Sequence, residues 1–247
     1  MAAPSAMITG LTEAVAMAIT MPMVIAITTM TTAPIATPEA ARLFLQQILS
    51  PAFPVGGFAW SQGLEWAMDQ GAVTRTTLPV WLADWLDHGT GRADALLVAL
   101  ALRPGADHEG LDDLARAACL TCQRLTETQE QGAALTASLA ALTGADLPPL
   151  TLPVAFGRAC AALPLPRPEI VAAWLLTQAT GLISAAVRFM PLGPLQGQRL
   201  LAAMRPGILA RAEWAATADQ DALASATWGA DIAAMRHETM TTRIFRS

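Results

Sequence analysis

Two cysteines separated by two residues, Cys119 and Cys122, have the spacing that comes closest to a chemical motif in this sequence. On a helix their sulfur atoms would lie one turn apart, but a tetrahedral zinc site needs four ligands. The sequence has no second cysteine pair, and its three histidines, His88, His108 and His237, are far apart. A redox pair would normally accompany a βαβ unit, for which there is no pattern. We therefore predict no metal site and structural cysteines, with Cys122 on the buried side of a helix.

Other catalytic signatures are missing as well. Gly56 and Gly57 are not followed by the lysine of a phosphate-binding loop, and neither a dinucleotide fingerprint nor a nucleophile elbow occurs. The net charge is −5 and the fifteen basic residues form no cluster, which argues against a nucleic-acid partner. We therefore expect a protein that is not an enzyme and that uses no cofactor.

A segment rich in proline and glycine, residues 51–65 with the sequence PAFPVGGFAWSQGLE, calls for an explanation. Gly56 and Gly57 permit a positive φ angle or a close approach of two backbones. We expect Phe58 to pack into the core and Ser61 to cap the following helix. We expect Trp60 to lie near the surface, where tryptophan often anchors a partner. A tight connection between helices would explain the glycines but not an exposed Trp60.

The C-terminal segment, residues 235–247 with the sequence MRHETMTTRIFRS, combines arginines with Ile244 and Phe245. Arginine and phenylalanine are favoured in protein interfaces, and leaving both apolar side chains exposed without a purpose would be costly. Two interpretations are open. The segment could become ordered when it binds a partner, or it could dock on its own domain.

Helical periodicity dominates the rest of the chain. Hydrophobic residues make up 53% of it and charged residues 14%, and much of the apolar fraction is alanine, which favours helix. Thr37-Pro38-Glu39 combines an N-cap hydroxyl, a first-turn proline and an early acid. The predicted helical segments are 38–49, 61–70, 78–85, 93–102, 111–125, 127–142, 154–163, 168–190 and 194–218, the last kinked or broken at 205–207.

This pattern predicts an all-α fold. We expect one large bundle-like domain over residues 38–247, with a distinct tail from about residue 235. Residues 1–37 would be a disordered extension, or a stretch assigned to the protein from too early a start codon.

Two apolar stretches could be taken for membrane segments. Residues 14–38 carry no charge but contain three prolines, and no arginine precedes them as in a signal peptide. Residues 170–187 include Thr177, Gln178 and Ser184, which favours the buried centre of a bundle over a membrane helix. We expect no membrane association, and three cysteines, an odd and low number, fit a reducing cytoplasm.

The two unusual segments resemble the UreF family of urease accessory proteins. The family's Pro-x-Gly-Gly-Phe-x-x-Ser-x-Gly-Leu-Glu block is matched by Pro54, Gly56, Gly57, Phe58, Ser61, Gly63, Leu64 and Glu65. Its C-terminal block is matched by Met235, Arg236, His237, Glu238, Arg243, Phe245, Arg246 and Ser247, with Ile244 in place of leucine. Shorter matches at 152–157, 182–188 and 191–193 extend the resemblance from about Arg42 to Ser247. Trp60, where tyrosine or histidine is more usual, and Pro194, where glutamine is usual, depart from the family pattern.

The resemblance implies an all-α chaperone, commonly a homodimer, that works in the cytoplasm with UreD (called UreH in some organisms), UreG and apo-urease. The assembly would load nickel into apo-urease in a step linked to GTP hydrolysis by UreG. It implies contact surfaces rather than chemistry for the two segments. The residues we assign to partner binding are Pro54, Gly56, Gly57, Phe58, Trp60, Ser61, Glu65, Arg236, His237, Glu238, Arg243, Phe245 and Arg246.

Two other functions are open on the residues alone. A helical bundle rich in tryptophan could hold a small apolar molecule in an internal cavity. A membrane-attached helical protein would depend on residues 14–38. A large apolar cavity would favour the first alternative, and recovery only in detergent the second.

Overall fold

The computed structural model describes residues 35–145 and 147–247, and within these ranges all regular structure is helical. The elements are α2 (Pro38–Ile48), η1 (Gly57–Ala59), α3 (Leu64–Asp69), α4 (Leu78–Asp87), α5 (Thr90–Ala101), α6 (His108–Ala117), α7 (Cys122–Thr143), α8 (Leu152–Cys160), α9 (Arg167–Phe189), α10 (Pro194–Thr217), η2 (Gln220–Ala222) and α11 (Trp228–His237). The predicted all-α bundle is confirmed. The extension predicted for residues 1–37 lies outside the described residues except for 35–37.

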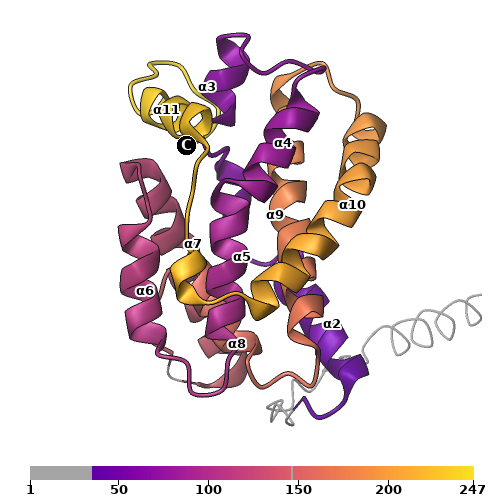
Figure 1. Cartoon of the computed structure of the whole chain (residues 1–247), viewed down its shortest axis with the longest axis vertical. Helices are drawn as coiled ribbons and strands as arrows, with labels where there is room; N and C mark the ends of the chain where they lie inside the picture. The colour runs from indigo at the N-terminus through magenta and orange to yellow at the C-terminus, as the bar shows by residue number, and fades with distance from the viewer. Residues whose placement is uncertain (1–34, 146) are drawn as a thin grey trace, which may run out of the picture. The chain divides into compact units, whose positions relative to one another are not determined.

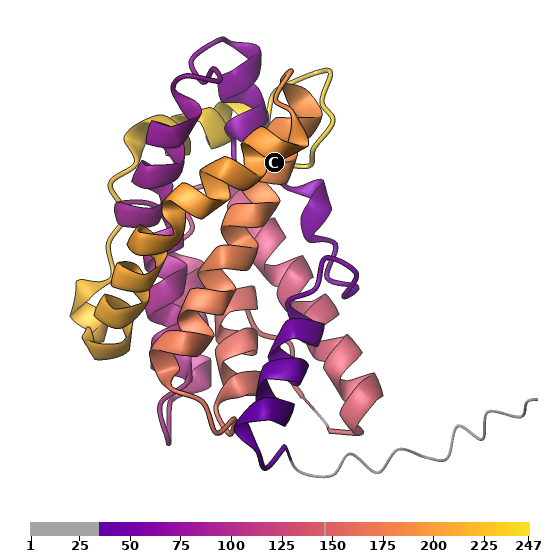
Figure 2. The same ribbon diagram turned by 90° about the vertical axis from the view of Figure 1, so that its right-hand side faces the viewer.

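Helix α5 lies in the middle of the bundle and is surrounded by α4, α6, α8, α9 and α10 (Figures 1 and 2). Residues 95–101 are all at most 5% exposed, so this helix is apolar on every side, as a central helix must be. Glycine allows α8 to approach it closely: a Cβ on Gly157 would lie 2.6 Å from the Cβ of Ala101. The helices that carry the candidate site therefore pack around an apolar central helix.

Helix α9 is, among the described residues, the one helix whose length and composition would let it cross a membrane. Half of its most apolar stretch is buried inside the bundle, where it packs along α10. Trp174 is 2% exposed and its ring lies 4.7 Å from that of Phe156 on α8. Core packing therefore accounts for the apolar character of the 170–187 stretch.

The start of α2 follows the prediction, since the Thr37 side chain accepts a hydrogen bond of 3.2 Å from the Ala40 amide. The predicted helix over 111–125 is wrong, because α6 ends at Ala117 and α7 begins at Cys122. Thr121 causes the new start: its hydroxyl accepts a bond of 3.0 Å from the Arg124 amide. Cys119 therefore lies in a link between helices, and Cys122 is exposed rather than buried.

A kink or break was predicted at 205–207, and the break is wrong, since α10 runs through Pro206 without interruption. Proline removes one hydrogen bond from a helix and leaves the carbonyl four residues earlier without its donor. Pro206 and Ala202 both lie on the exposed side of α10. Water can therefore bind the freed carbonyl, and the helix survives.

Candidate functional site

The two segments that the sequence singled out lie against each other, although their contacting residues Ser61 and Ser247 are 186 positions apart. Figure 1 places α11 and the C-terminus beside α3. The Ser61 amide donates to the Ser247 carbonyl at 3.0 Å, and the Arg246 amide donates to the Ala59 carbonyl at 2.7 Å. The Ser61 hydroxyl donates to the same Ser247 carbonyl, and the Gln62 amide donates to the Ser247 hydroxyl at 3.1 Å. We call this contact between residues 59–65 and 237–247 the tail anchor.

Glu65, near the start of α3, is the centre of the tail anchor. Its side chain is 1% exposed, yet its oxygens accept three hydrogen bonds from the C-terminal segment. The donors are the Ile244 amide at 2.6 Å, the Phe245 amide at 2.9 Å and His237 Nε2 at 2.8 Å. A buried carboxylate is tolerated when its lone pairs are satisfied in this way. Glu65 therefore fixes the path of the tail through backbone donors as well as through a side chain.

His237 is fully buried and connects the anchor to α7. While Nε2 binds Glu65, Nδ1 lies 3.0 Å from Gln123 Oε1 in the first turn of α7. The neighbouring Glu238 accepts a bond of 3.0 Å from the Cys122 amide, an unpaired donor at the start of the same helix. Two consecutive residues of the family motif thus tie α11 to the N-terminus of α7.

Backbone geometry explains the glycine and serine positions of the first segment. Gly56 and Gly63 have positive φ angles of 71° and 78°, and Gln62 has one of 54°. A Cβ on Gly63 would lie 2.8 Å from the Ala234 Cα, so only glycine lets α3 and α11 approach so closely. The strained Gln62 turns the amides of Ser61 and Gln62 toward Ser247, which forms a small nest of donors. The N-cap of α3 is Gly63 rather than the predicted Ser61, although the Ser61 hydroxyl accepts from the Glu65 amide in the first turn at 3.2 Å.

Arginines cover the outer side of the tail anchor. Arg246 pairs with Glu130 of α7 at 2.8 Å and lies 4.4 Å over the ring of Trp60. Arg188 of α9 lies 4.4 Å over the ring of Phe245 and donates to the Phe58 carbonyl at 2.6 Å. These contacts hold both aromatic rings against the bundle.

Two expectations about aromatic residues are wrong. Trp60 is 5% exposed rather than near the surface, because Arg246 and the tail cover it. Phe58, expected in the core, is 74% exposed, because the turn at Gly56 and the η1 helix direct it outward. Of the two interpretations of the tail, docking on its own domain is the one seen in the single chain, where Phe245 is 2% exposed and Ser247 is 1% exposed.

The predicted partner-binding residues therefore divide into two groups within one region. Half-buried or exposed positions available for contact are Pro54, Gly56, Gly57, Phe58, Arg236, Glu238, Arg243 and Arg246. Buried positions that build the anchor are Trp60, Ser61, Glu65, His237 and Phe245.

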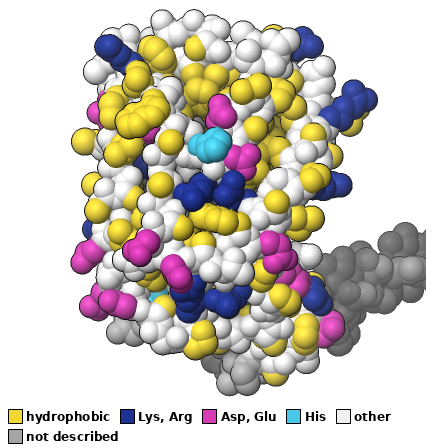
Figure 3. Space-filling view, viewed as in Figure 1, with side chains coloured by type: hydrophobic (Ala, Val, Ile, Leu, Met, Phe, Trp, Pro, Cys, Tyr) yellow, Lys and Arg dark blue, Asp and Glu magenta, His cyan; other side chains and the backbone are white. Residues whose placement is uncertain are grey.

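One feature of the region was missed in the sequence. Trp228, Ile232 and Met235 of α11 are 73%, 53% and 46% exposed, and the tail adds Ile244 at 65%. Figure 3 shows hydrophobic side chains gathered over the part of the surface where Figure 1 places α11. In the sequence, the spacing of four and then three residues between Trp228, Ile232 and Met235 could have shown that these side chains share one face of a helix. Exposed apolar patches of this kind mark interaction surfaces.

Within residues 35–145 and 147–247 no group of three or more His, Cys, Asp or Glu side chains is placed to hold a metal ion. The site is instead a network of buried hydrogen bonds around Glu65 that holds apolar and basic side chains at the surface. Its arrangement suits the binding of another polypeptide.

Known proteins are similar to this chain over most of its length. The family model described as UreF matches residues 73–205, a central region between the two motif segments. The urease accessory protein UreF of Paracoccus denitrificans is 68% identical over 85% of this chain and 98% of its own length. Proteins of the same name from Cereibacter sphaeroides and a Jannaschia species are 54% and 42% identical, over 85% and 83% of this chain and 100% and 94% of their own lengths. The chain therefore belongs to the UreF family of urease accessory proteins.

Proposed function

We propose that this chain is a non-catalytic scaffold that acts in the cytoplasm with UreD (UreH) and UreG to assemble the nickel centre of apo-urease in a GTP-dependent step. Membership of a family of urease accessory proteins supports this role. The observation that carries the proposal is the tail anchor, because its buried half holds its exposed half in a fixed position. We infer that the exposed half, the side chains of Arg243, Ile244 and Arg246, binds UreD.

The tail anchor favours UreD binding by lowering its entropic cost. A flexible tail would lose conformational entropy when a partner orders it. Here Glu65 already fixes the backbone at Ile244 and Phe245, so Ile244 and Arg243 extend from an ordered segment. A preorganised surface of this kind binds a partner with little ordering cost.

A homodimer that offers one platform to UreG is part of the same proposal. Sedimentation of the full chain over a range of concentrations tests it directly. A mass of twice 25.9 kDa supports the dimer, and a monomer at every concentration contradicts it.

The alternative of a bundle that holds a small apolar molecule has less support. A cavity of about 370 Å³ is bordered by Asp94, Arg124, Glu127 and Asp231. Placing an uncharged apolar molecule beside these groups would remove their water without replacing its hydrogen bonds.

Binding assays with purified UreD test the role of the exposed half. Ile244→Asp places a charge on the exposed side while keeping the backbone donors to Glu65, and we expect it to weaken UreD binding at least tenfold. Val80→Asp on α4 is the matched control, since Val80 is 61% exposed, close to the 65% of Ile244. Equal binding of UreD by both variants and the wild-type chain would contradict this part of the proposal.

Deletion of residues 236–247 provides a less specific version of the test. It removes Phe245 and three donors to Glu65, so it disturbs the fold as well as the surface. Thermal unfolding of each variant therefore accompanies the binding measurement, and a loss of UreD binding by the deletion variant supports the proposal only if Ile244→Asp, with a wild-type melting temperature, shows the same loss.

A further inference from the structure

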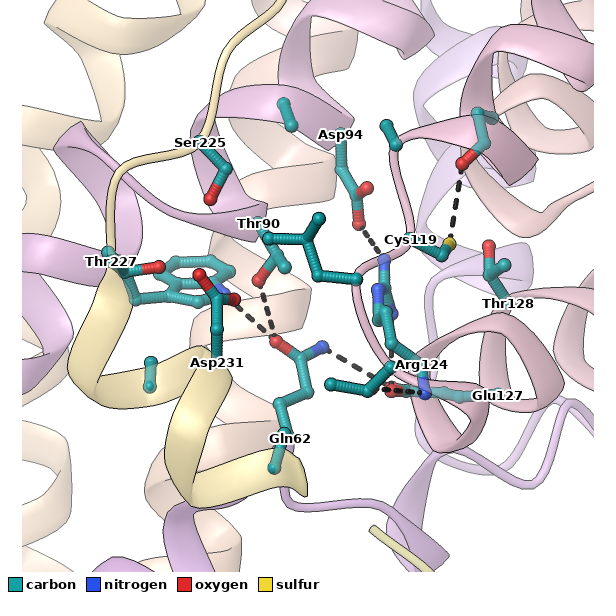
Figure 4. A pocket seen from close by; sticks show the side chains of 18 of the residues that line it. Gln62, Thr90, Asp94, Cys119, Arg124, Glu127, Thr128, Ser225, Thr227 and Asp231 are labelled. Atoms are coloured by element: carbon teal, nitrogen blue, oxygen red, sulfur yellow. Dashed lines mark hydrogen bonds and ion pairs between the residues drawn. The ribbon is translucent and has the colours of Figure 1, made fainter. Parts of the chain in front are cut away.

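A cavity of about 370 Å³ lies beside the tail anchor but is separate from its exposed side. Its walls come from α4, α5, α6, α7, α11 and the link between η2 and α11. Figure 4 shows Asp94 and Thr90 entering from α5, Arg124 and Glu127 from α7, and Asp231 from α11. The volume falls within the usual range for small-molecule sites.

The charges around the cavity are unbalanced. Arg124 is its one lining cation among the described residues, and it faces Asp94 at 2.5 Å and Glu127 at 3.2 Å. Asp231 also borders the space, and no side-chain hydrogen bond or ion pair of Asp231 is formed within the described part of the chain. Burial raises the pKa of all three carboxyl groups, although Arg124 acts in the opposite direction on Asp94 and Glu127. Only Asp231 has no positive charge beside it among the described residues.

Two buried oxygen atoms on the walls lack hydrogen-bond partners within residues 35–145 and 147–247. They are Glu127 Oε2, on a side chain that is 3% exposed, and Ser225 Oγ in the link before α11. Arg124 Nη1 is near Glu127 Oε2 but is not aligned to donate to it. Buried polar atoms are nearly always satisfied. Glu127 Oε2 has the charge of Arg124 beside it, whereas Ser225 Oγ needs a donor that a ligand with N–H groups would supply.

The rest of the lining is apolar and aromatic. Trp81, Trp85, Leu97, Leu114 and Leu182 border the cavity. Gln62 holds the Trp85 ring in place by accepting from its Nε1 at 3.2 Å, and it accepts from the Thr90 hydroxyl at 2.8 Å. An indole face next to carboxylates suits an organic cation with a short apolar chain.

We propose that this cavity binds a small organic cation, an ammonium or guanidinium group on a short alkyl chain, with Asp231 receiving the charged end. The alkyl chain lies against the tryptophan and leucine side chains. The charged end donates N–H groups to Asp231 and to Ser225 Oγ, which lie on the same side of the cavity (Figure 4). This site is independent of the proposed scaffold function.

Isothermal titration of the full-length chain with butylguanidinium tests the proposal, with butylurea as an uncharged molecule of the same length and similar shape. Asp231→Asn removes the carboxylate that lacks a partner and keeps the side-chain volume. Asp84→Asn, on the exposed side of α4, is the matched control. We expect butylguanidinium to bind the wild-type and Asp84→Asn chains with equal affinity. It should bind the Asp231→Asn chain at least tenfold more weakly. Butylurea should not bind any of the three chains.

Three results would overturn the proposal. They are equal binding of butylguanidinium and butylurea, binding of butylguanidinium that is unchanged in Asp231→Asn, and no binding of butylguanidinium to the wild-type chain. Nickel ion alone is titrated in a separate experiment. Binding of nickel that depends on Asp231, without any binding of butylguanidinium, also contradicts the proposal.

Discussion

Two buried glutamates of this protein, Glu65 and Glu127, have almost equal exposure and opposite surroundings. Glu65 is 1% exposed, and both of its oxygens accept well-placed hydrogen bonds from the tail. Glu127 is 3% exposed and accepts from Gln62 and Gln131 on one oxygen, while the other borders a cavity and is ion-paired with Arg124 at 3.2 Å without a hydrogen bond. The difference teaches that burial alone does not identify the role of a carboxylate. A carboxylate with a full set of donors holds the fold together, and one that is only partly satisfied can border a binding cavity.

Gln62 links the two regions. Its amide belongs to the donors around Ser247, and its side chain reaches Glu127, Trp85 and Thr90. It is also, among the described residues, the one non-glycine residue with a positive φ angle. A strained residue that serves both sites at once indicates that the tail anchor also shapes one wall of the cavity.

The largest expected effect is the loss of Glu65. Glu65→Ala leaves His237 and two backbone amides without their acceptor in a buried place. We expect a loss of about 3–5 kcal/mol in the free energy of unfolding. Urea denaturation measures this loss. Glu109→Ala on the exposed side of α6 should change stability by less than about 0.5 kcal/mol, and equal effects of the two variants would contradict a structural role for Glu65.

Gly63→Ala should have the next largest effect. Gly63 and Gly144 have similar φ angles, 78° and 72°, but only at Gly63 would a Cβ meet another helix. Gly144→Ala should therefore cost about 1–2 kcal/mol from backbone strain alone. Gly63→Ala should cost about 1–3 kcal/mol more because α11 must move. Denaturation of the two variants side by side isolates the contact between α3 and α11, and equal losses would show that this contact carries no energy.

Glu127 should show a pH dependence. Burial raises the pKa of its carboxyl above the ordinary value of 4.5, although Arg124 acts in the opposite direction. A raised folded-state pKa means that this group's contribution is complete below pH 4.5 and is lost as pH rises through the raised value. The wild-type chain should therefore lose stability relative to Glu127→Gln between about pH 4 and about pH 7. Denaturation midpoints across this range measure the effect, and a difference that is constant or grows in favour of the wild type would be the opposite result.

The smallest expected effect concerns the outer side of the tail anchor. Arg246 pairs with Glu130 through side chains that are 54% and 47% exposed, and it also covers Trp60. Exposed ion pairs and cation–π contacts contribute little, so Arg246→Ala should cost about 1 kcal/mol. Thermal unfolding at low and high salt checks this. A loss as large as that of Glu65→Ala would mean that the anchor depends on its surface rather than on its buried carboxylate.

Local signals in the sequence predicted much of the fold. The Thr37 cap and the apolar pattern of α9 both appear where they were expected. The errors came from competition between signals. A regular apolar spacing through 111–125 concealed the Thr121 cap, and Pro206 seemed stronger than it is because its exposed position could not be known.

The candidate site was predicted as two segments but not as one structure. Sequence spacing gives no information on a contact between Ser61 and Ser247, which are 186 positions apart. For the same reason the exposures of Trp60 and Phe58 were reversed, since the residue that covers Trp60 is Arg246 in the other segment. The cavity was missed because its polar residues come from α5, α7 and α11, and no single segment displays them together.

The most direct test of the account is hydrogen exchange at the amides of Ile244, Phe245 and Arg246 in the free protein. These amides donate to Glu65 and to the Ala59 carbonyl, so they should exchange as slowly as amides within α3. Addition of UreD should change them little, while it protects the exposed side chains around Ile244 from surface labelling. Rapid exchange in the free chain that becomes slow only when UreD is added would contradict the account, because the tail would then be ordered by its partner and not by Glu65.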